Sequence, residues 1–139
     1  MHTLFGSSTT FGNISRNWCR SYNSWVIMID YDGNPNNGPF KTKRAAIQPS
    51  RDGDGVDYHL AYYTYGQFMK FVRRGAHRVH STEGTRRLAN AAFQNPDGAV
   101  VLVVINLDRS HAALRVACET REFDAKLPGK AMATYIWRP

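Results

Sequence analysis

The sequence predicts a mainly β fold, in which a helix–strand–loop–helix segment typical of a (β/α)8 barrel precedes a C-terminal antiparallel β-sandwich. Three observations support this prediction. Short apolar runs alternate with turn residues at regular spacing from residue 76 onward, which is typical of a sandwich. Asp97-Gly98 lies between two apolar runs and favours a hairpin. Val100–Leu107 is almost continuously apolar, as expected for a central strand that is covered on both faces.

The N-terminal part is predicted to form a helix, a buried strand and a loop, in that order. One helix face is outlined by apolar residues spaced four, four and three apart, with Asn13 before them as the N-cap: Ile14, Trp18, Tyr22 and Trp25. The β-branched run Val26–Ile29 suits a short buried strand, and Asp30–Pro39 consists almost wholly of turn-forming residues. Residues 41–56 are interpreted as a second loop with a short strand around Ala45–Ile47. This order matches one rung of a barrel, and one rung cannot close a barrel.

A second helix is expected from Tyr58 to about Arg74, with Asp57 as its cap and Gly75 at the position after its end. Its apolar residues are spaced i, i+3, i+4 and i+7, at Tyr65, Phe68, Met69 and Val72. The strands expected after it are His77–Ser81, Leu88–Gln94, Val100–Leu107, Ala113–Cys118, Arg121–Ala125 and Ala131–Trp137. We therefore divide the chain into the barrel-like segment 1–57, the helix 58–75 and the sandwich 76–139.

Length and composition are those of one ordinary globular domain. The chain has 139 residues, of which 42% are hydrophobic and 21% charged, whereas a (β/α)8 barrel needs about 250 residues. No run of eighteen apolar residues occurs, so no membrane span is expected. Met1–Asn13 lacks the features of a signal peptide, which leaves the compartment unassigned. Cys19 and Cys118 carry no metal-binding spacing, and we expect two buried thiols, with a disulfide as the alternative.

Positive charge is concentrated just after the second helix. The net charge is +7, and six basic residues fall between positions 70 and 87: Lys70, Arg73, Arg74, Arg78, Arg86 and Arg87. Such a cluster can attract phosphates or anionic lipids. We favour the interpretation that Arg73 and Arg74 complement the dipole in the last helical turn while the others are solvated. A nucleic-acid partner is not expected.

Two further patterns have an ordinary structural explanation. Aromatic residues of the second helix could form a platform for sugars or bases, but their helical spacing favours core packing: Tyr58, Tyr62, Tyr63, Tyr65, Phe68 and Phe71. His77 and His80 are three residues apart on a predicted strand, so they point to opposite faces. Without a third ligand, the sequence predicts neither a metal nor a cofactor.

A family resemblance is carried by three segments that follow one another in order: YYTYGQFMKFVRRGAHRV, FQNPDGAVVLVVINLDRS and LPGKAMATYIWRP. From about Phe11 to Trp137 the chain resembles the C-terminal end of glucosylceramidase-like glycoside hydrolases (family 30). The resemblance implies that residues 1–40 correspond to the last rungs of a catalytic barrel, Tyr58–Arg74 to its closing helix and the rest to most of a β-sandwich. It also implies a parent enzyme with a carbohydrate or glycolipid substrate, a role in carbohydrate or sphingolipid metabolism, and a secreted or extracytoplasmic location.

Catalysis in that family implies two glutamates, one as acid/base and one as nucleophile, about 5–5.5 Å apart. The acid/base belongs to a strand outside this chain. When Thr9-Thr10-Phe11-Gly12 is aligned with the family's segment, the nucleophile position falls on Ser7, and no acidic residue precedes Asp30. The glutamates present all lie in the sandwich half, where Glu119 and Glu122 are expected to be solvated; the third is Glu83. The resemblance therefore implies no catalytic residue within this chain.

Trp25, Asp30 and Asn37 are the candidate substrate-binding residues, as remnants of a pocket wall. Counterparts of their loop border the sugar pocket in the family. Trp25 aligns with the first Trp of a Trp-x-x-Trp-Asn-Leu segment, whose second Trp and Asn fall on Met28 and Ile29. The alternative, which we favour, is a core Trp beside polar residues that cap the loop.

Three functional hypotheses follow. The first, which we favour, is a C-terminal fragment of a retaining β-glycoside hydrolase. It would be inactive alone because both glutamates are missing, and it would self-associate through a barrel-facing apolar surface on residues 58–72. The second is a non-catalytic sandwich module that binds carbohydrate or an anionic polymer. The third is residual hydrolase activity in which a second chain completes the site.

Overall fold

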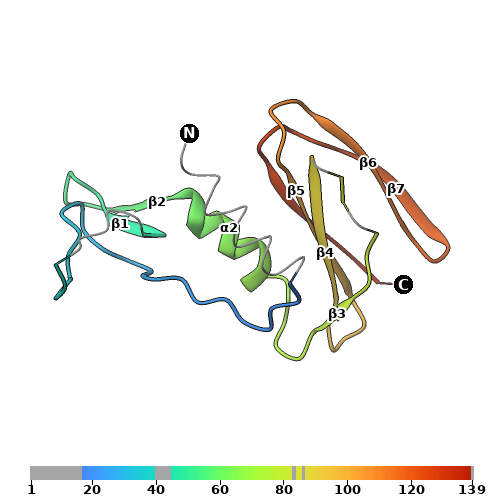
Figure 1. Ribbon diagram of the computed structural model, residues 1–139, viewed down its shortest axis with the longest axis horizontal. Coiled ribbons are helices and arrows are strands. Elements are labelled where there is room, and N and C mark those ends of the chain that lie inside the picture. Colours follow the sequence, from blue (N-terminus) through green and yellow to red (C-terminus); the bar gives the residue numbers. More distant parts are fainter. Residues whose placement is uncertain (1–16, 40–44, 83, 86, 139) are drawn as a thin grey trace.

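The computed structural model describes residues 17–39, 45–82, 84–85 and 87–138. Figure 1 shows a small hairpin at one end, a sandwich of strands at the other, and a helix between them. The elements are β1 (Ile47–Pro49), β2 (Val56–Tyr58), α2 (Leu60–Met69), β3 (His77–Val79), β4 (Leu88–Gln94), β5 (Val100–Asn106), β6 (Ala112–Cys118), β7 (Arg121–Leu127) and β8 (Met132–Trp137). Within these described ranges, no helix is long and apolar enough to cross a bilayer.

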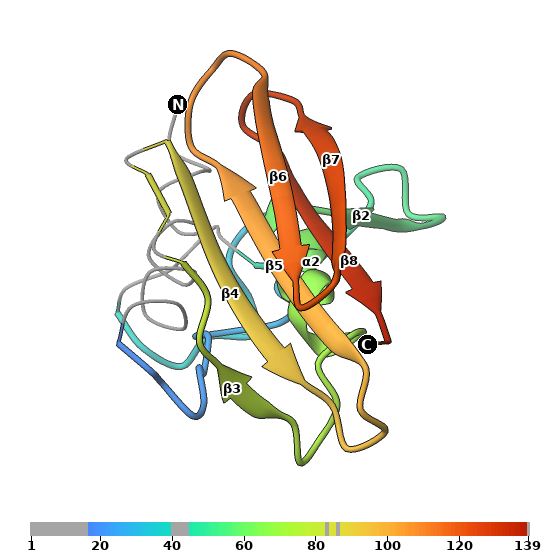
Figure 2. The ribbon, with the colours of Figure 1, turned by 90° about the vertical axis from the view of Figure 1, so that its right-hand side faces the viewer.

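The sandwich consists of a four-stranded sheet and a two-stranded ribbon. The sheet has the order β3-β4-β5-β8 with antiparallel neighbours, and β6 pairs with β7. Figure 2 shows this ribbon lying across one face of the sheet. The turn between β4 and β5 is closed by a hydrogen bond of 2.8 Å from Asn95 N to Ala99 O, and Gly98 adopts a φ of 81° that glycine tolerates. The predicted hairpin and sandwich are confirmed.

Strand β5 forms the centre of the molecule because both of its faces are covered. On one face, Val101, Val103 and Ile105 pack with Ala91 against apolar residues of α2 and the segment after it, namely Phe68, Phe71 and Val72. On the other face, Leu102 and Val104 pack against Val116 and Leu127 of the ribbon. The continuous apolar run in the sequence therefore serves two separate cores.

Helix α2 is shorter than predicted. It begins after His59, which makes no side-chain cap, while Asp57 belongs to β2; both the predicted start and the predicted cap are wrong. The helix ends at Met69, so the interpretation that Arg73 and Arg74 occupy its last turn and Gly75 directly follows it is also wrong. Asn95 explains the early end: its Oδ1 accepts a hydrogen bond from Arg73 N at 3.0 Å, and its Nδ2 donates to Phe71 O at 3.0 Å.

The predicted N-terminal helix is wrong for residues 17–25, which form no helix; Asn13 and Ile14 lie outside the described residues. Trp18 has a φ of 54°, which a right-handed helix does not accommodate. The predicted buried strand is also wrong. Ile27 and Met28 are 70% and 50% exposed, and of this run Ile29 alone is buried.

Asp30–Pro39 forms a loop, and β1 and β2 form a small hairpin. Asp30–Pro39 contains neither helix nor strand, as predicted. The short strand expected around Ala45–Ile47 is displaced to β1, and its partner β2 was not predicted. Met28 joins β1 through a single parallel bridge to Ile47.

The two cysteines are both free. Cys19 is exposed, so the prediction of two buried thiols is wrong for it, whereas Cys118 is half-buried on β6. The alternative of a disulfide is likewise contradicted.

Candidate functional site

The loop that follows Ile29 is organised by the carboxylate of Asp30. Its Oδ1 accepts hydrogen bonds from the backbone N–H groups of Asp32 at 2.9 Å and Asn34 at 2.7 Å, and its Oδ2 accepts one from Asn34 Nδ2 at 3.0 Å. These bonds, chiefly the one from the Asn34 backbone, hold the pKa of Asp30 below its ordinary value. Asp30 is therefore an ionised group that shapes its own loop, and it is not suited to donate a proton near neutral pH.

Two long-range contacts attach this loop to the β1–β2 hairpin. The buried Gln48 donates its Nε2 to the backbone oxygen of Asp30 at 3.0 Å. The hydroxyl of Tyr31 donates to Asp57 Oδ2, and this bond raises the pKa of Tyr31. The guanidinium of Arg51 lies 4.5 Å from the centre of the Tyr31 ring. These contacts were missed in the sequence because their partners are far apart along the chain.

Trp25 and Asn37 do not join Asp30 in a common contact. Trp25 is 85% exposed, so its interpretation as a core residue is wrong. Asn37 is exposed as well, and no described hydrogen bond or ring contact connects either residue to Asp30. The loop-capping interpretation holds for Asp30, and a role of all three residues in a pocket wall stays a prediction.

The glutamates of the ribbon lie in open positions. Glu119 is in the tight turn between β6 and β7 with a φ of 54°, and Glu122 follows on β7; both are exposed, as predicted. Beside them, Arg115 binds Asp124 with two hydrogen bonds of 2.8 and 3.0 Å. Glu83 lies outside the described residues.

The basic residues between positions 70 and 87 do not form one uniform patch. Arg73 pairs with Asp97 at 3.3 Å, and Arg87 pairs with Asp108 at 3.2 Å. The guanidinium of Arg78 lies 4.6 Å from the ring centre of Trp18, and burial lowers the pKa of Arg78. Exposed pairs of this kind contribute little to stability, and they leave less of the cluster's charge for an anionic partner. Arg86 lies outside the described residues.

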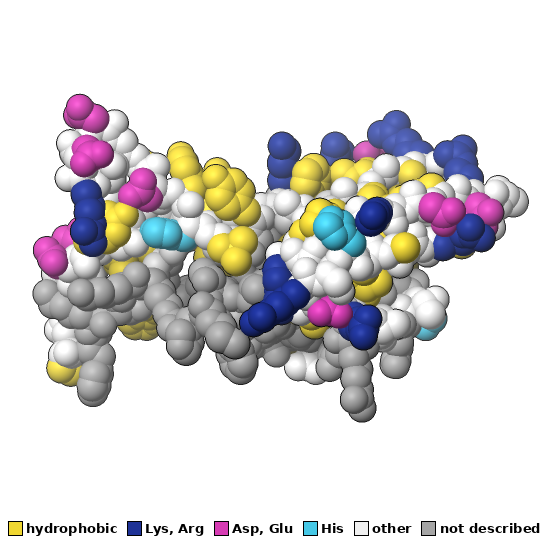
Figure 3. All heavy atoms as spheres, turned by 90° about the horizontal axis from the view of Figure 1, so that it is seen from above, with side chains coloured by type: hydrophobic (Ala, Val, Ile, Leu, Met, Phe, Trp, Pro, Cys, Tyr) yellow, Lys and Arg dark blue, Asp and Glu magenta, His cyan; other side chains and the backbone are white. Residues whose placement is uncertain are grey.

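Exposed apolar side chains are concentrated before the sandwich. Figure 3 shows hydrophobic side chains at the surface between the two ends of the molecule. Of the thirteen large hydrophobic residues exposed among the described residues, the eleven within residues 18–69 are Trp18, Tyr22, Trp25, Ile27, Met28, Val56, Tyr58, Leu60, Tyr62, Tyr63 and Met69. The prediction that the aromatic residues of the second helix serve the core is thus right for Phe68 and Phe71 and wrong for Tyr58, Tyr62 and Tyr63.

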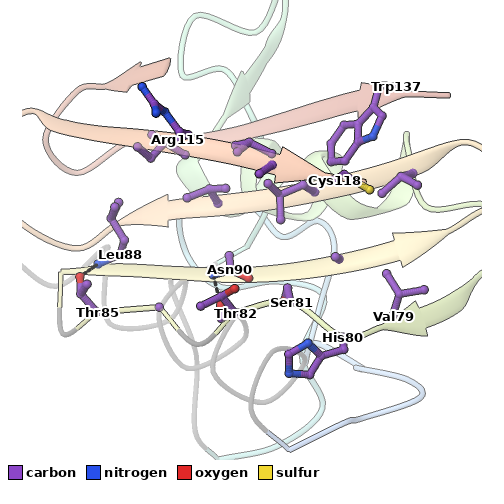
Figure 4. Close-up of a pocket in the computed structure, with 18 residues that line it drawn as sticks. Val79, His80, Ser81, Thr82, Thr85, Leu88, Asn90, Arg115, Cys118 and Trp137 are labelled. Carbon is purple, nitrogen blue, oxygen red and sulfur yellow. Dashed lines mark hydrogen bonds between the residues drawn. The ribbon is translucent and has the colours of Figure 1, made fainter. Parts of the chain in front are cut away.

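A groove of about 370 Å³ lies between the ribbon and the four-stranded sheet. Figure 4 shows its walls: β6 on one side, β4 with residues 80–82 and 84–85 on the other, and Trp137 at one end. Asn90 donates its Nδ2 to Thr82 O at 2.9 Å, which joins Thr82 to β4. The lining is mainly apolar, and within the described residues no group of three metal-ligating side chains occurs.

Comparison with known proteins identifies relatives of the sandwich. The family model described as the glycosyl hydrolase family 30 beta sandwich domain matches residues 75–135. Lysosomal acid glucosylceramidase from Mus musculus is 30% identical over 125 residues, which make up 88% of this chain and 20% of that protein. The chain thus spans about a fifth of the length of this curated relative.

Two solved structures are similar over almost the whole chain. The endo-beta1,6-glucanase BT3312 is 25% identical with a TM-score of 0.88, over 99% of this chain and 31% of that one. SrfJ from Salmonella typhimurium is 28% identical with the same TM-score of 0.88, over 99% of this chain and 32% of that one. The similarity therefore extends beyond the sandwich to α2 and the segment before it.

Proposed function

From the premise that this chain is a C-terminal part of a glycosyl hydrolase family 30 protein, we propose that it is the scaffold portion of a retaining β-glycoside hydrolase and does not cleave glycosides by itself. The parent would hydrolyse O-glycosyl bonds of a carbohydrate or a glycolipid. The names of the relatives, a glucosylceramidase and an endo-beta1,6-glucanase, support these two substrate classes.

The distribution of exposed apolar surface carries this proposal. Residues 18–69 expose eleven large hydrophobic side chains, whereas the sandwich exposes Phe123 and Ile136 among its described residues. Exposed apolar side chains in such number mark a face that another part of a protein covers. Tyr58, Tyr62 and Tyr63 form its best-defined part, because their neighbouring rings pack at 4.6 and 5.4 Å. In the parent enzyme a catalytic barrel would cover this face.

The state of the carboxylates supports the absence of catalysis in this chain alone. Glycoside cleavage with retention needs one protonated and one ionised carboxyl group close together. Asp30 is ionised and bound within its own loop, and Glu119 and Glu122 are exposed on the ribbon. The lowered pKa of Asp30 is the opposite of what a general acid needs.

An activity assay tests the catalytic half of the proposal. We expect purified chain to release no more product from an activated aryl β-glucoside than buffer does, and Asp30→Ala to behave identically. Turnover by the unaltered chain that is lost in Asp30→Ala would establish residual hydrolysis instead, including hydrolysis at a site completed by a second chain.

The exposed surface is tested by light scattering together with a dye that fluoresces on apolar surfaces. We expect the chain to self-associate and to bind the dye, and both signals to fall in the double variant Tyr62→Ser, Tyr63→Ser. Ile136→Ser, which alters an exposed residue of the sandwich, is the matched control and should change neither. A monomer that does not bind the dye contradicts the proposal.

The second candidate function is a non-catalytic module that binds carbohydrate or an anionic polymer. The net charge of +7 favours the polymer, and the aromatic group Phe123, Tyr135 and Trp137 on the sandwich favours carbohydrate. Binding to heparin should weaken steeply with salt, whereas binding to an oligosaccharide should not. A titration at two salt concentrations without binding to either ligand would eliminate this candidate.

A further inference from the structure

The loop Asp30–Pro39 contains a backbone nitrogen that can attack a neighbouring side chain. Asn37 is the only asparagine of the sequence that is followed by a glycine. Asn37 and Gly38 are both exposed, and neither belongs to a helix or a strand. Figure 1 shows their loop beside the β1–β2 hairpin, at the end of the molecule away from the sandwich. Because exposed loops change conformation at little cost, this pair can react without displacing a packed element.

The other asparagines of this loop lack such a nitrogen. Asn34 is followed by a proline, which has no backbone N–H, and its side chain donates to Asp30 Oδ2 at 3.0 Å. Asn36 is followed by Asn37, whose Cβ crowds an approach to its backbone nitrogen. Glycine has no Cβ and the widest choice of backbone conformations. The nitrogen of Gly38 is thus the least hindered nucleophile beside an asparagine in this loop.

One hydrogen bond restrains the nitrogen of Gly38. Gly38 N donates to Asn36 Oδ1 at 3.0 Å. The nitrogen must lose this proton before it can act as a nucleophile, and the bond to Oδ1 stabilises the protonated form. Asn36 is half-buried, whereas the reacting pair is exposed. Asn36 therefore holds the reactive nitrogen in its unreactive form, and loss of this single bond would release it.

We propose that Asn37–Gly38 is a site of spontaneous deamidation whose rate is limited by Asn36. After Gly38 N loses its proton to hydroxide, it attacks Cγ of Asn37. A bond forms between this nitrogen and Cγ, the bond from Cγ to Nδ2 breaks, and Nδ2 takes up a proton and leaves as ammonia. Water then opens the five-membered imide at either carbonyl, which gives aspartate or isoaspartate. The overall reaction consumes one water and releases one ammonia.

The new carboxyl group changes the charge of the molecule and the backbone of the loop. It is ionised near neutral pH, so the formal net charge falls by one from +7. Isoaspartate also adds one methylene to the main chain. The hydrogen bonds that Asp30 accepts from Asp32 and Asn34 precede this position, and we expect them to persist. Because the ammonia is lost, the loop undergoes a slow, one-way change of charge at Asn37.

Incubation of the full chain followed by peptide mapping tests this site. We expect the tryptic peptide of residues 21–41 to gain about 1 Da, with the change localised to Asn37 and isoaspartate among the products. The rate should rise between about pH 7 and about pH 9, because the reacting nitrogen must be deprotonated. Urea unfolding of the product should match that of the fresh chain. Aspartate without isoaspartate would mean direct hydrolysis by water and would overturn the role of Gly38.

Matched variants identify the reacting nitrogen and its restraint. Gly38→Ala should slow the reaction about tenfold or more, because the added Cβ crowds the nitrogen; this Cβ would lie 3.5 Å from Asn36 Oδ1, so the loop accommodates it. Gly66→Ala, also at a position with room for a Cβ, is the control and should change the rate by less than about twofold. Asn36→Ala should raise the rate about twofold or more, because it removes the acceptor of the Gly38 N–H.

Three results would overturn the proposal. Asn34 or Asn36 could deamidate as fast as Asn37, or Gly38→Ala could react as fast as the unaltered chain. An unchanged rate in Asn36→Ala would remove the restraint assigned to that side chain. Asn37→Gln should abolish the mass change, because attack on its Cδ would close a larger ring, and a change that persists there contradicts the assignment as well. These readouts depend neither on self-association nor on glycoside cleavage, so they are independent of the scaffold proposal.

Discussion

Replacing Asn106 should destabilise the sandwich more than its polar character suggests. This side chain is fully buried at the end of β5. Its Nδ2 lies 2.9 Å from Ser110 O, 3.2 Å from Leu127 O and 3.0 Å from Pro128 O, and its Oδ1 accepts a bond of 3.0 Å from Asp108 N. One amide thus joins the β5–β6 connection to the β7–β8 connection at one end of the sandwich.

The magnitude follows from these bonds. An amide has two N–H donors, so the three oxygens share two bonds, and Oδ1 adds a third. At about 0.5–1.5 kcal/mol for each net bond, Asn106→Ala should lower the free energy of unfolding by about 1.5–4.5 kcal/mol. The cavity left by the side chain adds to this loss. The change is a large fraction of the about 5–15 kcal/mol that holds a typical domain together.

Urea unfolding monitored by circular dichroism measures this loss. With a slope of about 1–3 kcal/mol per molar urea, a loss of about 3 kcal/mol moves the midpoint down by about 1–3 M. Asn106→Asp should be at least as harmful near neutral pH because a carboxylate oxygen then faces backbone oxygens, and the loss should shrink in acid, where the protonated group again donates. Asn37→Ala, at an exposed asparagine, is the control and should change stability by less than about 0.5 kcal/mol. If Asn106→Ala also changes the free energy of unfolding by less than about 0.5 kcal/mol, the stability assigned to its hydrogen bonds is wrong.

Three further predictions concern Gly129, which has no room for a side chain, Gly66, which has room for one, and the carboxylate of Asp30. Gly129→Ala should strongly destabilise the chain in the same urea assay, because a Cβ there would lie 1.9 Å from Arg109 O; a neutral result contradicts it. Gly66→Ala should raise the free energy of unfolding by about 0.5–1 kcal/mol, because Gly66 lies within α2 with nothing near its Cβ position, and a loss would count against this. The lowered pKa of Asp30 means that its stabilising contribution is present above the unfolded pKa of about 3.9 and is lost as the pH falls through the lower folded value. Amide shifts of Asn34 should follow that titration below about pH 4, and Asp30→Asn should abolish the pH dependence; an Asn34 amide that does not titrate refutes it.

The sandwich could be predicted because several signals agree at each strand. In β5, length, β-branching and continuous apolarity all indicate a central strand, and the turn at Asn95–Gly98 sets its register with β4, in which Gln94 pairs with Val100. The predicted ends of the sandwich strands differ from the observed ends by a few residues at most. β7 runs on to Leu127 because that residue pairs with Ala112 and enters the core, a long-range cause that local spacing does not reveal.

The prediction of an N-terminal helix was wrong because hydrophobic periodicity shows which side chains would share one face of a helix. It does not show whether another part of the protein buries that face. Trp18 and Trp25 repeat at helical spacing, yet both are exposed and the described residues between them form no helix. Helix α2 was overextended for a related reason. Its apolar residues continue to Val72, but Asn95, distant in sequence, binds the backbone that follows the helix.

Much less of the candidate site could be predicted. Asp30 was singled out because counterparts of its loop border the sugar pocket in the family it resembles, and the structure gives it the loop-capping role that was the favoured alternative. The hydrogen bond between Tyr31 and Asp57 joins residues 26 positions apart, and no local sequence pattern predicts it. The aromatic group Phe123, Tyr135 and Trp137 was missed because it combines β7 with β8, whose adjacency depends on the packing of the sandwich.

Burial divides the chain into parts of unequal stability. Both core clusters belong to the sandwich together with Phe68, Phe71 and Val72. Before residue 60 the buried apolar residues among those described are Ile29, Ala45 and Ala46, too few to stabilise a segment independently. The Asp30 loop therefore depends on hydrogen bonds within the loop and to the β1–β2 hairpin, which open without global unfolding. In hydrogen exchange on the full chain, we expect the amides of Val101 to Ile105 to exchange only through global unfolding and those of Asp32 and Asn34 to exchange far faster. Equal protection of the two groups would mean that the loop unfolds cooperatively with the sandwich, and the division drawn from burial would be wrong.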